Sequence, residues 1–386
     1  MRPHMPPGDR AQGRNLFFME GTKPRTVSSL GMFDLLKGAG MLTIVLAHTS
    51  ESYSLPAVNA TSLAVLLPFI YRETLMAAFF IASGYGFRKR SIHKCIEQQV
   101  KGLLKPYLLT ALCTCALHLL VHYHTFHYWP SSLYETYKVA GGFFLGLPHT
   151  ATYFGQVFFS AGPMWYMLAL MVGWVMLDCI LNIFPERYTN WAVAGCALLG
   201  WGTSLVWEPP FCLTQGMVIV PYLYIGFLAK KHHWLEHPLS RRAKIALGAA
   251  TVGIALGALL TQTTDSVSMA HWTLGPVSIL LDGMVGYLFI RMFLRWNKGN
   301  GPVVRWLETA GRRSLYIFCV HTVELIAFPW YLFAARFAGQ PLLGFVLQFA
   351  VSWGTIWAVC ALLVRRRELQ DKLFPARRKK VYASRH

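Results

Sequence analysis

The chain has 386 residues, of which 54% are hydrophobic and only 14% are charged. A soluble globular chain carries about 25% charged residues, so this composition argues against an ordinary water-soluble fold. The formal net charge of +19 does not indicate nucleic-acid binding, because the Lys and Arg residues cluster in short segments between apolar runs, as in the cytoplasmic loops of membrane proteins.

The two ends of the chain differ from the apolar part between them. Residues 1–30 contain Pro, Gly and several charges but no apolar segment of signal-peptide length. We expect them to form a disordered cytoplasmic tail. Residues 31–365 would form one membrane domain, and residues 366–386 a basic cytoplasmic tail that contacts lipid.

Ten apolar runs are long enough to cross a bilayer as helices. A helix makes all of its backbone hydrogen bonds within the segment, as lipid requires. The predicted spans lie near residues 31–50, 63–87, 103–123, 162–184, 190–207, 212–229, 243–262, 271–294, 312–335 and 341–364. Gly and Pro interrupt the apolar stretch 139–160, which we interpret as an interfacial or re-entrant segment. The predicted fold is all-α, a polytopic integral membrane protein with about ten helices in one bundle.

The charge distribution agrees with ten spans, which place both termini and the even-numbered loops on one side. Of the 36 Lys and Arg residues, 33 fall on that side, and Arg72, Lys138 and Arg336 do not. Positive charge stays in the cytoplasm. We therefore predict a multi-pass protein of the plasma (inner) membrane with both termini cytoplasmic.

The first predicted span carries ionisable groups, which are costly inside a bilayer and by default indicate function. Lys37 and His48 are eleven residues apart, which places them on nearly the same helix face, about 17 Å apart along the axis. A cation near the cytoplasmic mouth can hold a phosphate or carbonyl group, and a neutral imidazole can remove a proton from a hydroxyl group. Alternatively, Lys37 reaches the interface and His48 lies at the far end of the span.

Five segments follow one another along the chain: FDLLKGAGMLTIVLAHTS at 33–50, FFIASGYGFRKR at 79–90, LLKPYLL at 103–109, GPMWYMLAL at 162–170 and SLYIFCVH at 314–321. Together they resemble the membrane-bound acyltransferase 3 family, in which a basic residue, usually Arg, precedes a His by eleven positions in the first span. The resemblance covers residues 31–365. It implies a ten-span transferase that takes an acyl group, commonly acetyl, from cytoplasmic acyl-CoA to a hydroxyl group, often on a cell-surface or exported carbohydrate.

The resemblance also implies residue roles. His48 corresponds to the essential histidine of the family, acting either as general base or as an acylated relay, and Lys37 corresponds to its basic partner. Lysine keeps the charge but lacks the planar guanidinium group of Arg, so bidentate recognition of a phosphate or carbonyl group does not follow from the resemblance. Acetyl-CoA or another acyl-CoA is the expected co-substrate, and a carbohydrate or glycan the expected acceptor.

Several other residues are candidates for the site. The cations Arg88, Arg90, Lys101 and Lys105 either bind the CoA phosphates or simply retain a loop in the cytoplasm. Possible acceptor-site residues, each with a structural or interfacial alternative, are Arg72, Glu73, Trp165 and His321; Glu324 can share a helix face with His321.

The histidine run His118, His122, His124 and His127 suggests a metal site, but its interleaved aromatic residues favour a membrane interface, so we predict no metal.

Two other functions fit the same sequence. One is a secondary transporter or exporter of a polar envelope precursor, with Lys37, Arg72, Glu73 and Asp282 along its path. The other is a membrane sensor that keeps the fold without turnover. Neither would consume acyl-CoA. The sequence leaves open the acceptor, the acyl group, the route of transfer and the oligomeric state.

Overall fold

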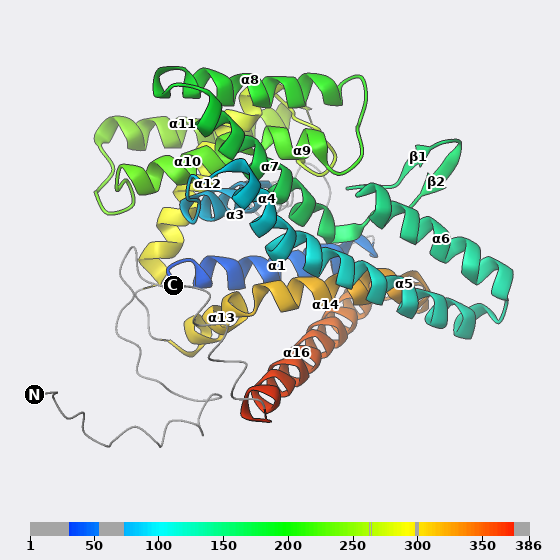
Figure 1. Ribbon diagram of the computed structural model, residues 1–386. Coiled ribbons are helices and arrows are strands. Elements are labelled where there is room, and N and C mark those ends of the chain that lie inside the picture. The colour runs from blue at the N-terminus through cyan, green and yellow to red at the C-terminus, as the bar shows by residue number, and fades with distance from the viewer. Residues whose placement is uncertain (1–30, 54–72, 262, 264, 298–300, 374–386) are drawn as a thin grey trace, which may run out of the picture.

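The computed structural model describes residues 31–53, 73–261, 263, 265–297 and 301–373. Most of this part of the chain is helical, and its one sheet among the described residues is a short hairpin (Figure 1). The first half contains α1 (Asp34–Glu51), α3 (Glu73–Tyr85), α4 (Ile92–Gln99), a π-helix (Val100–Leu104), α5 (Lys105–Phe126), α6 (Trp129–Leu145), a 3-10 turn (Gly162–Met164) and α7 (Trp165–Ile183). The second half contains α8 (Glu186–Ser204), α9 (Leu213–Val218), α10 (Val220–Lys231), α11 (Arg241–Thr261), α12 (Pro276–Trp296), α13 (Pro302–Arg312), α14 (Ser314–Ala327), α15 (Trp330–Arg336) and α16 (Pro341–Leu373).

Six helical segments in the described ranges are long and apolar enough to cross a membrane, and a bent pair would make seven. They are Ile92–Phe126, Gly162–Ile183, Leu213–Lys231, Arg241–Thr261, Pro276–Trp296 and Pro341–Arg366, with α14 and α15 as the pair. Helices α1 and α8 form where spans were predicted but are not among these segments. The start of the second predicted span lies outside the described residues, which leaves the shorter apolar helix Leu75–Tyr85. The count of ten is therefore not confirmed and stays a prediction.

Three local features were not predicted. Between the second and third predicted spans the chain forms α4 and the π-helix, which continue into α5, and α13 lies between the eighth and ninth predicted spans. Both helices carry enough charged residues to look like loops in a hydropathy reading. The span predicted at 312–335 is bent by 68° between α14 and α15. Pro329 lies at this break, and the residue before a proline is disfavoured in helical conformation; Phe328 is accordingly extended, with ψ of 136°.

A hairpin occupies the end of the stretch predicted as interfacial or re-entrant. After α6, strands β1 (Ala151–Tyr153) and β2 (Gln156–Phe158) pair antiparallel. Phe154 and Gly155 link them with φ values of 53° and 73°, the positive angles that a type I′ turn requires. The all-α class is thus correct except for this two-stranded sheet.

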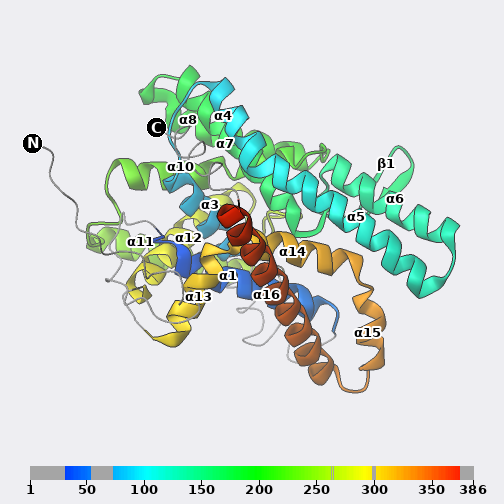
Figure 2. The same ribbon diagram turned by 60° about the horizontal axis from the view of Figure 1, so that its bottom comes forward.

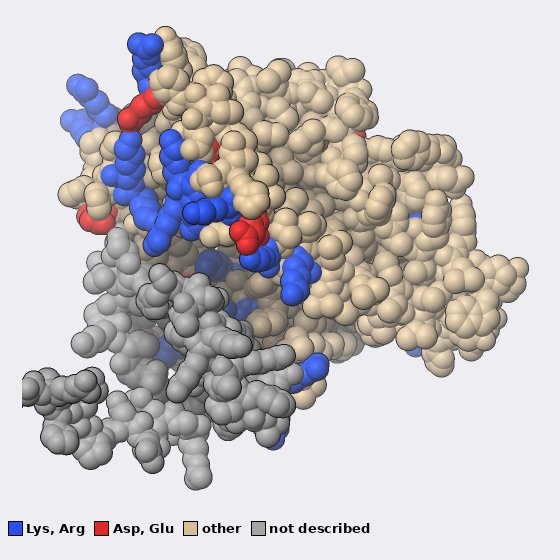
Figure 3. Space-filling model, in the orientation of Figure 1, with Lys and Arg blue, Asp and Glu red and all other residues tan. Residues whose placement is uncertain are grey.

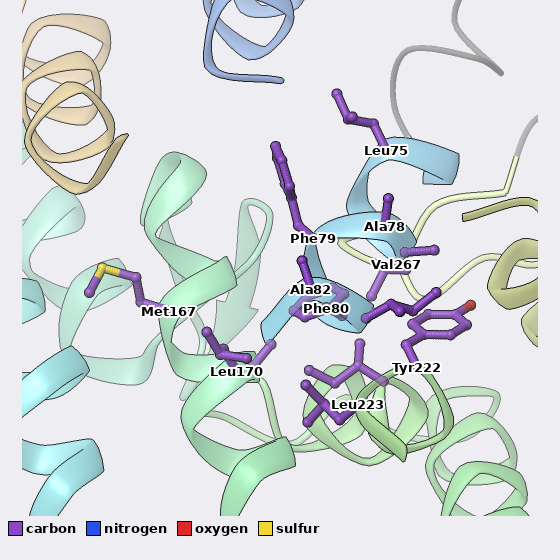
Figure 4. Close-up of a cluster of buried hydrophobic side chains, with 14 of the residues drawn as sticks. Leu75, Ala78, Phe79, Phe80, Ala82, Met167, Leu170, Tyr222, Leu223 and Val267 are labelled. Carbon is purple, nitrogen blue, oxygen red and sulfur yellow. The ribbon is translucent and has the colours of Figure 1, made fainter. Parts of the chain in front are cut away.

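Helix α3 lies at the centre of the hydrophobic core, where it packs against α10 and α12 (Figure 4). The fully buried ring of Phe80 stacks on Tyr166 of α7, with centroids 4.7 Å apart, and faces Tyr222 of α10 at 6.4 Å. Gly84 brings the backbones of α3 and α10 into contact, since a Cβ there would overlap the backbone of Leu223. Gly84, near the end of this helix, therefore serves close helix packing.

The basic side chains gather at one end of the molecule. Figure 3 shows Lys and Arg near the start of α1 and where α10 leads into α11, whereas the end with the hairpin and α6 shows almost none on this face. Helices α1 and α14 extend between these two ends (Figures 1 and 2). We call them the basic end and the hairpin end below.

Helix α1 is held against α13 at the basic end by two glycines. A Cβ on Gly38 would overlap the Leu307 carbonyl oxygen, and a Cβ on Gly311 would overlap the Asp34 carbonyl oxygen. Neither glycine has a positive φ, so their role is close approach and not backbone conformation.

At the hairpin end, one acidic residue connects the loop before β1, strand β1 and helix α9. Glu208 accepts from His149 Nε2 at 2.9 Å and from Gln215 Nε2 at 2.7 Å, and its carbonyl oxygen accepts from the Tyr153 hydroxyl. The hydrogen bond to Glu208 raises the pKa of His149 above its usual value, against the opposing effect of partial burial. This ion pair lies outside the predicted spans and makes the loop contacts sensitive to pH.

We expect Gly38→Ala to destabilise the protein by about 1–3 kcal/mol, because the added methyl group must push α1 away from α13. The measurement is thermal unfolding of the purified protein in detergent. Gly354→Ala in α16 is the matched control, since nothing lies within 4 Å of a Cβ there and a helical alanine is favoured over glycine by about 0.5–1 kcal/mol. Equal unfolding temperatures for the two variants would contradict this account of the contact.

We expect the stabilisation contributed by the His149–Glu208 pair to depend on pH. A histidine whose pKa is raised by folding stabilises the fold fully below its unfolded pKa, about 6.5, and loses that contribution as pH rises through the higher folded value. The gap in unfolding temperature between wild type and Glu208→Gln should therefore shrink from about pH 6 to about pH 9. In a His149→Asn background the gap should not change with pH. A gap that widens with pH would reverse the assigned sign.

Candidate active site

His48 lies in the last turn of α1, toward the hairpin end. Its side chain is half-buried, with 29% exposed, and Nδ1 lies 3.3 Å from the Glu51 carboxylate on the same helix. The ring therefore combines a carboxylate partner with access from outside the bundle. Both properties suit a group that takes up and releases a proton.

A second histidine lies beside it on α14. The rings of His48 and His321 have centroids 5.6 Å apart at an interplanar angle of 39°. His321 is only 1% exposed. Packing of α1 against α14 thus places two imidazoles together that are far apart in the sequence.

The tautomer of His321 follows from its partner. Its Nδ1 lies 2.9 Å from Glu324 Oε1, and an ionised carboxylate only accepts, so Nδ1 carries the proton. Nε2 is then the basic nitrogen. It is buried and has no hydrogen-bond partner among the described residues. His321 is hydrogen-bonded through Nδ1 as a structural histidine would be, yet its Nε2 accepts no hydrogen bond from the described residues.

Three helices fix the Glu324 carboxylate. Besides His321 on its own helix, Trp330 Nε1 of α15 donates to Oε2 at 3.0 Å and Ser352 Oγ of α16 donates to the same oxygen at 3.2 Å. The bend at Phe328–Pro329 turns the Trp330 indole back so that it also reaches the Glu324 carbonyl oxygen at 3.1 Å. A buried carboxylate needs such donors to offset its lost hydration.

Lys37 lies three turns from His48 on α1. It is half-buried on the part of the helix that packs against α13. The continuous helix from Asp34 to Glu51 keeps the two residues on one face, about 17 Å apart along the axis. The cation is therefore at the basic end and the imidazole toward the hairpin end, as the spacing predicts.

The segment between α3 and α5 carries the other predicted cations. Arg88 is exposed and Arg90 half-buried in the turn before α4, and Lys105 is exposed at the start of α5. Lys101 is exposed and forms an ion pair with Glu97. These side chains belong to the basic end, where an anionic ligand would be attracted.

Two side chains of α7 hold this basic turn in place, and sequence analysis missed both. Asp178 Oδ1 accepts from the Arg90 N–H at 3.0 Å, and Asn182 Nδ2 donates to the Arg90 carbonyl oxygen at 2.8 Å. Asp178 is fully buried. Both backbone groups of Arg90 are thereby fixed to a core helix, so the cations project from a firm support.

The remaining predicted residues lie elsewhere or outside the described ranges. Arg72 lies outside the described residues, and Glu73 is the first residue of α3. Trp165 is buried at 8% exposed, edge-on to Tyr166 with ring centroids 6.3 Å apart, which makes it part of the core wall. Among the described residues, no group of three or more His, Cys, Asp or Glu side chains has the arrangement of a metal site.

The described site therefore combines the imidazoles of His48 and His321 with the Lys37 ammonium group. The buried Glu324 carboxylate orients His321, and Lys37 lies on the same helix as His48. Such a site can accept a proton from a hydroxyl group beside a bound electrophile. A family model described as an acyltransferase domain matches residues 31–364. No match was found among curated proteins or among solved structures.

Proposed function

This chain belongs to the acyltransferase 3 family, and on that premise we propose that it transfers an acetyl or other short acyl group from cytoplasmic acyl-CoA to a hydroxyl group of a cell-surface or exported carbohydrate. The observation that carries the proposal is the 5.6 Å pairing of His48 with His321, whose Nδ1 is held by Glu324. The cations that would bind the donor lie at the basic end and the histidine pair lies toward the hairpin end, so the acyl group would move from the first to the second.

The donor enters from the basic end. By the rule that positive charge stays inside, this end faces the cytoplasm of the plasma (inner) membrane and both termini lie there. Lys37 and the cations Arg88, Arg90, Lys101 and Lys105 attract the phosphates of CoA. The pantetheine arm then extends along α1 and carries the thioester toward His48.

Transfer needs a base beside the thioester. His48 takes the proton of the acceptor hydroxyl as its oxygen attacks the thioester carbonyl carbon; the C–S bond breaks, and the CoA thiolate takes the proton back from the imidazolium. A relay also balances: an imidazole nitrogen of His48 forms the acyl bond, CoA leaves as the thiol, and the acceptor attacks the acyl-imidazole. Release of CoA before the acceptor is added separates the relay from direct attack.

His321 supports His48 in either route. With Nδ1–H donated to Glu324, its Nε2 is a buried base next to the His48 ring. Charging both rings at 5.6 Å in a low-dielectric site is costly, so an uncharged His321 adds no repulsion when His48 becomes an imidazolium during transfer.

We expect His48→Ala to lower acetyl-CoA consumption about 10²- to 10⁴-fold, the usual contribution of a positioned base. The measurement uses purified protein in lipid nanodiscs with radiolabelled acetyl-CoA. His124→Ala, which alters an exposed histidine of α5, should match wild type. A transporter or a sensor with this fold would consume no acetyl-CoA in any variant, and equal rates for wild type and His48→Ala would remove the catalytic assignment.

We expect Lys37→Ala to weaken acetyl-CoA binding about 10- to 100-fold, the range for a lost hydrogen bond to a charged group. The affinity of wild type should also fall with added salt more steeply than that of the variant. Lys244→Ala is the control, because Lys244 is an exposed cation at the start of α11 and tests the general field of the basic end. If the two variants bind acetyl-CoA equally well, Lys37 has no specific docking role.

A further inference from the structure

The histidines of α5 form a stripe that the proposed reaction does not use. His118 and His122 lie one turn apart with ring centroids 5.6 Å from each other, and Phe126 follows at 4.5 Å from His122. All three lie on one face of the helix, as a spacing of four residues requires. Their position is the outer half of α5, toward the hairpin end (Figure 2).

Two adjoining hollows lie along this stripe, with volumes of about 280 and 420 Å³. They share His118, His122, Phe126 and Tyr331, so we treat them as one groove, the α5–α15 groove. Their sizes are those of small-ligand sites. Aromatic rings from three elements line the groove: Phe126 of α5, Phe159 after β2 and Tyr331 of α15.

The groove presents oriented hydrogen-bond acceptors. His122 Nδ1 lies 2.9 Å from Ser132 Oγ, and that hydroxyl already donates its proton to the Tyr128 carbonyl oxygen. His122 must therefore donate from Nδ1, which leaves Nε2 as an acceptor. Thr136 also holds the His118 ring, with its Oγ1 2.8 Å from Nδ1. Helix α6 thus orients both rings.

The groove is close to electrically neutral. Glu135 is its one acidic lining residue among the described residues, and the Lys138 ammonium pairs with it at 2.7 Å. Lys138 itself lies over the rings of Tyr134 and Phe159 and is not a lining residue. Neither a Lys nor an Arg lines the groove in the described part of the chain. An anionic ligand would meet a carboxylate with no free cation to balance it.

The groove adjoins the histidine pair. Trp330 lines the smaller hollow and donates to the Glu324 carboxylate that holds His321. Ser52, one turn beyond His48 in the sequence, lines the same hollow. Hydrogen bonds through Trp330 and Glu324 therefore connect the groove to His321 of the histidine pair.

We propose that the α5–α15 groove is the acceptor site and that it takes an uncharged carbohydrate ring, with hydroxyl groups donating to the histidine Nε2 atoms and an apolar ring face on the aromatic residues. This deepens the proposed function and rests on it. Sugars have both a C–H face and a hydroxyl rim, which matches rings beside oriented acceptors. The paired Glu135 disfavours uronic acids and sugar phosphates.

The first test measures binding without turnover. Diethyl pyrocarbonate modifies histidine rings, and mass spectrometry of the purified protein in nanodiscs locates the modified residues. The probes are the methyl glycosides of glucose, galactose, mannose and N-acetylglucosamine, with methyl glucuronide as the charged match of the glucoside. We expect at least one neutral glycoside to reduce modification of His118 and His122 but not of exposed His124. Absence of protection by all four, or equal protection by the glucuronide, overturns the proposal.

The second test measures transfer with the best protecting glycoside. We expect His122→Ala to raise the KM for the glycoside about tenfold, the effect of one lost hydrogen bond, with the KM for acetyl-CoA within twofold of wild type. His124→Ala should change neither constant. Equal glycoside KM values for the two variants would exclude the groove as the acceptor site. Protection without acetyl-CoA consumption by wild type would instead refute the transferase and leave a glycan-binding groove.

Discussion

The rest of the site depends on the hydrogen bonds to the buried Glu324 carboxylate. A carboxylate in an apolar bundle is stable only when its oxygens are fully engaged. Donors from α14, α15 and α16 meet at its two oxygens, so separating these helices would leave buried carboxylate oxygens without hydrogen-bond donors. Because α1 also packs on α14 and α16, this anchor supports the position of His48 beside His321.

The donor end relies on close backbone contact instead of buried charge. Gly38 and Gly311 let α13 lie directly on α1 beside Lys37, and Asp178 and Asn182 attach the turn at Arg90 to α7. Cations on long side chains are mobile, but their backbone here is fixed to core helices. The basic end is thus a firm platform for phosphates, even though each exposed cation alone contributes little.

The bend between α14 and α15 serves both the catalytic pair and the groove proposed beside it. It turns Trp330 back onto Glu324 and presents Tyr331 to the histidine stripe of α5. A straight helix would carry both aromatic residues away from these positions. One proline therefore connects the orientation of His321 with the shape of the surface through which an acceptor would arrive.

The sequence by itself determined the helical class, the shared face of Lys37 and His48, and the family, because hydropathy, helical periodicity and ordered motifs are local properties of the chain. It also put Glu324 on the face of His321. Charged helices α4 and α13 were missed because amphipathic segments resemble loops when only hydropathy is read. Only the tertiary structure decided that His48 meets His321 and that Ser352 reaches Glu324. Periodicity fixes which residues share a helix face, but packing of whole helices decides which faces meet.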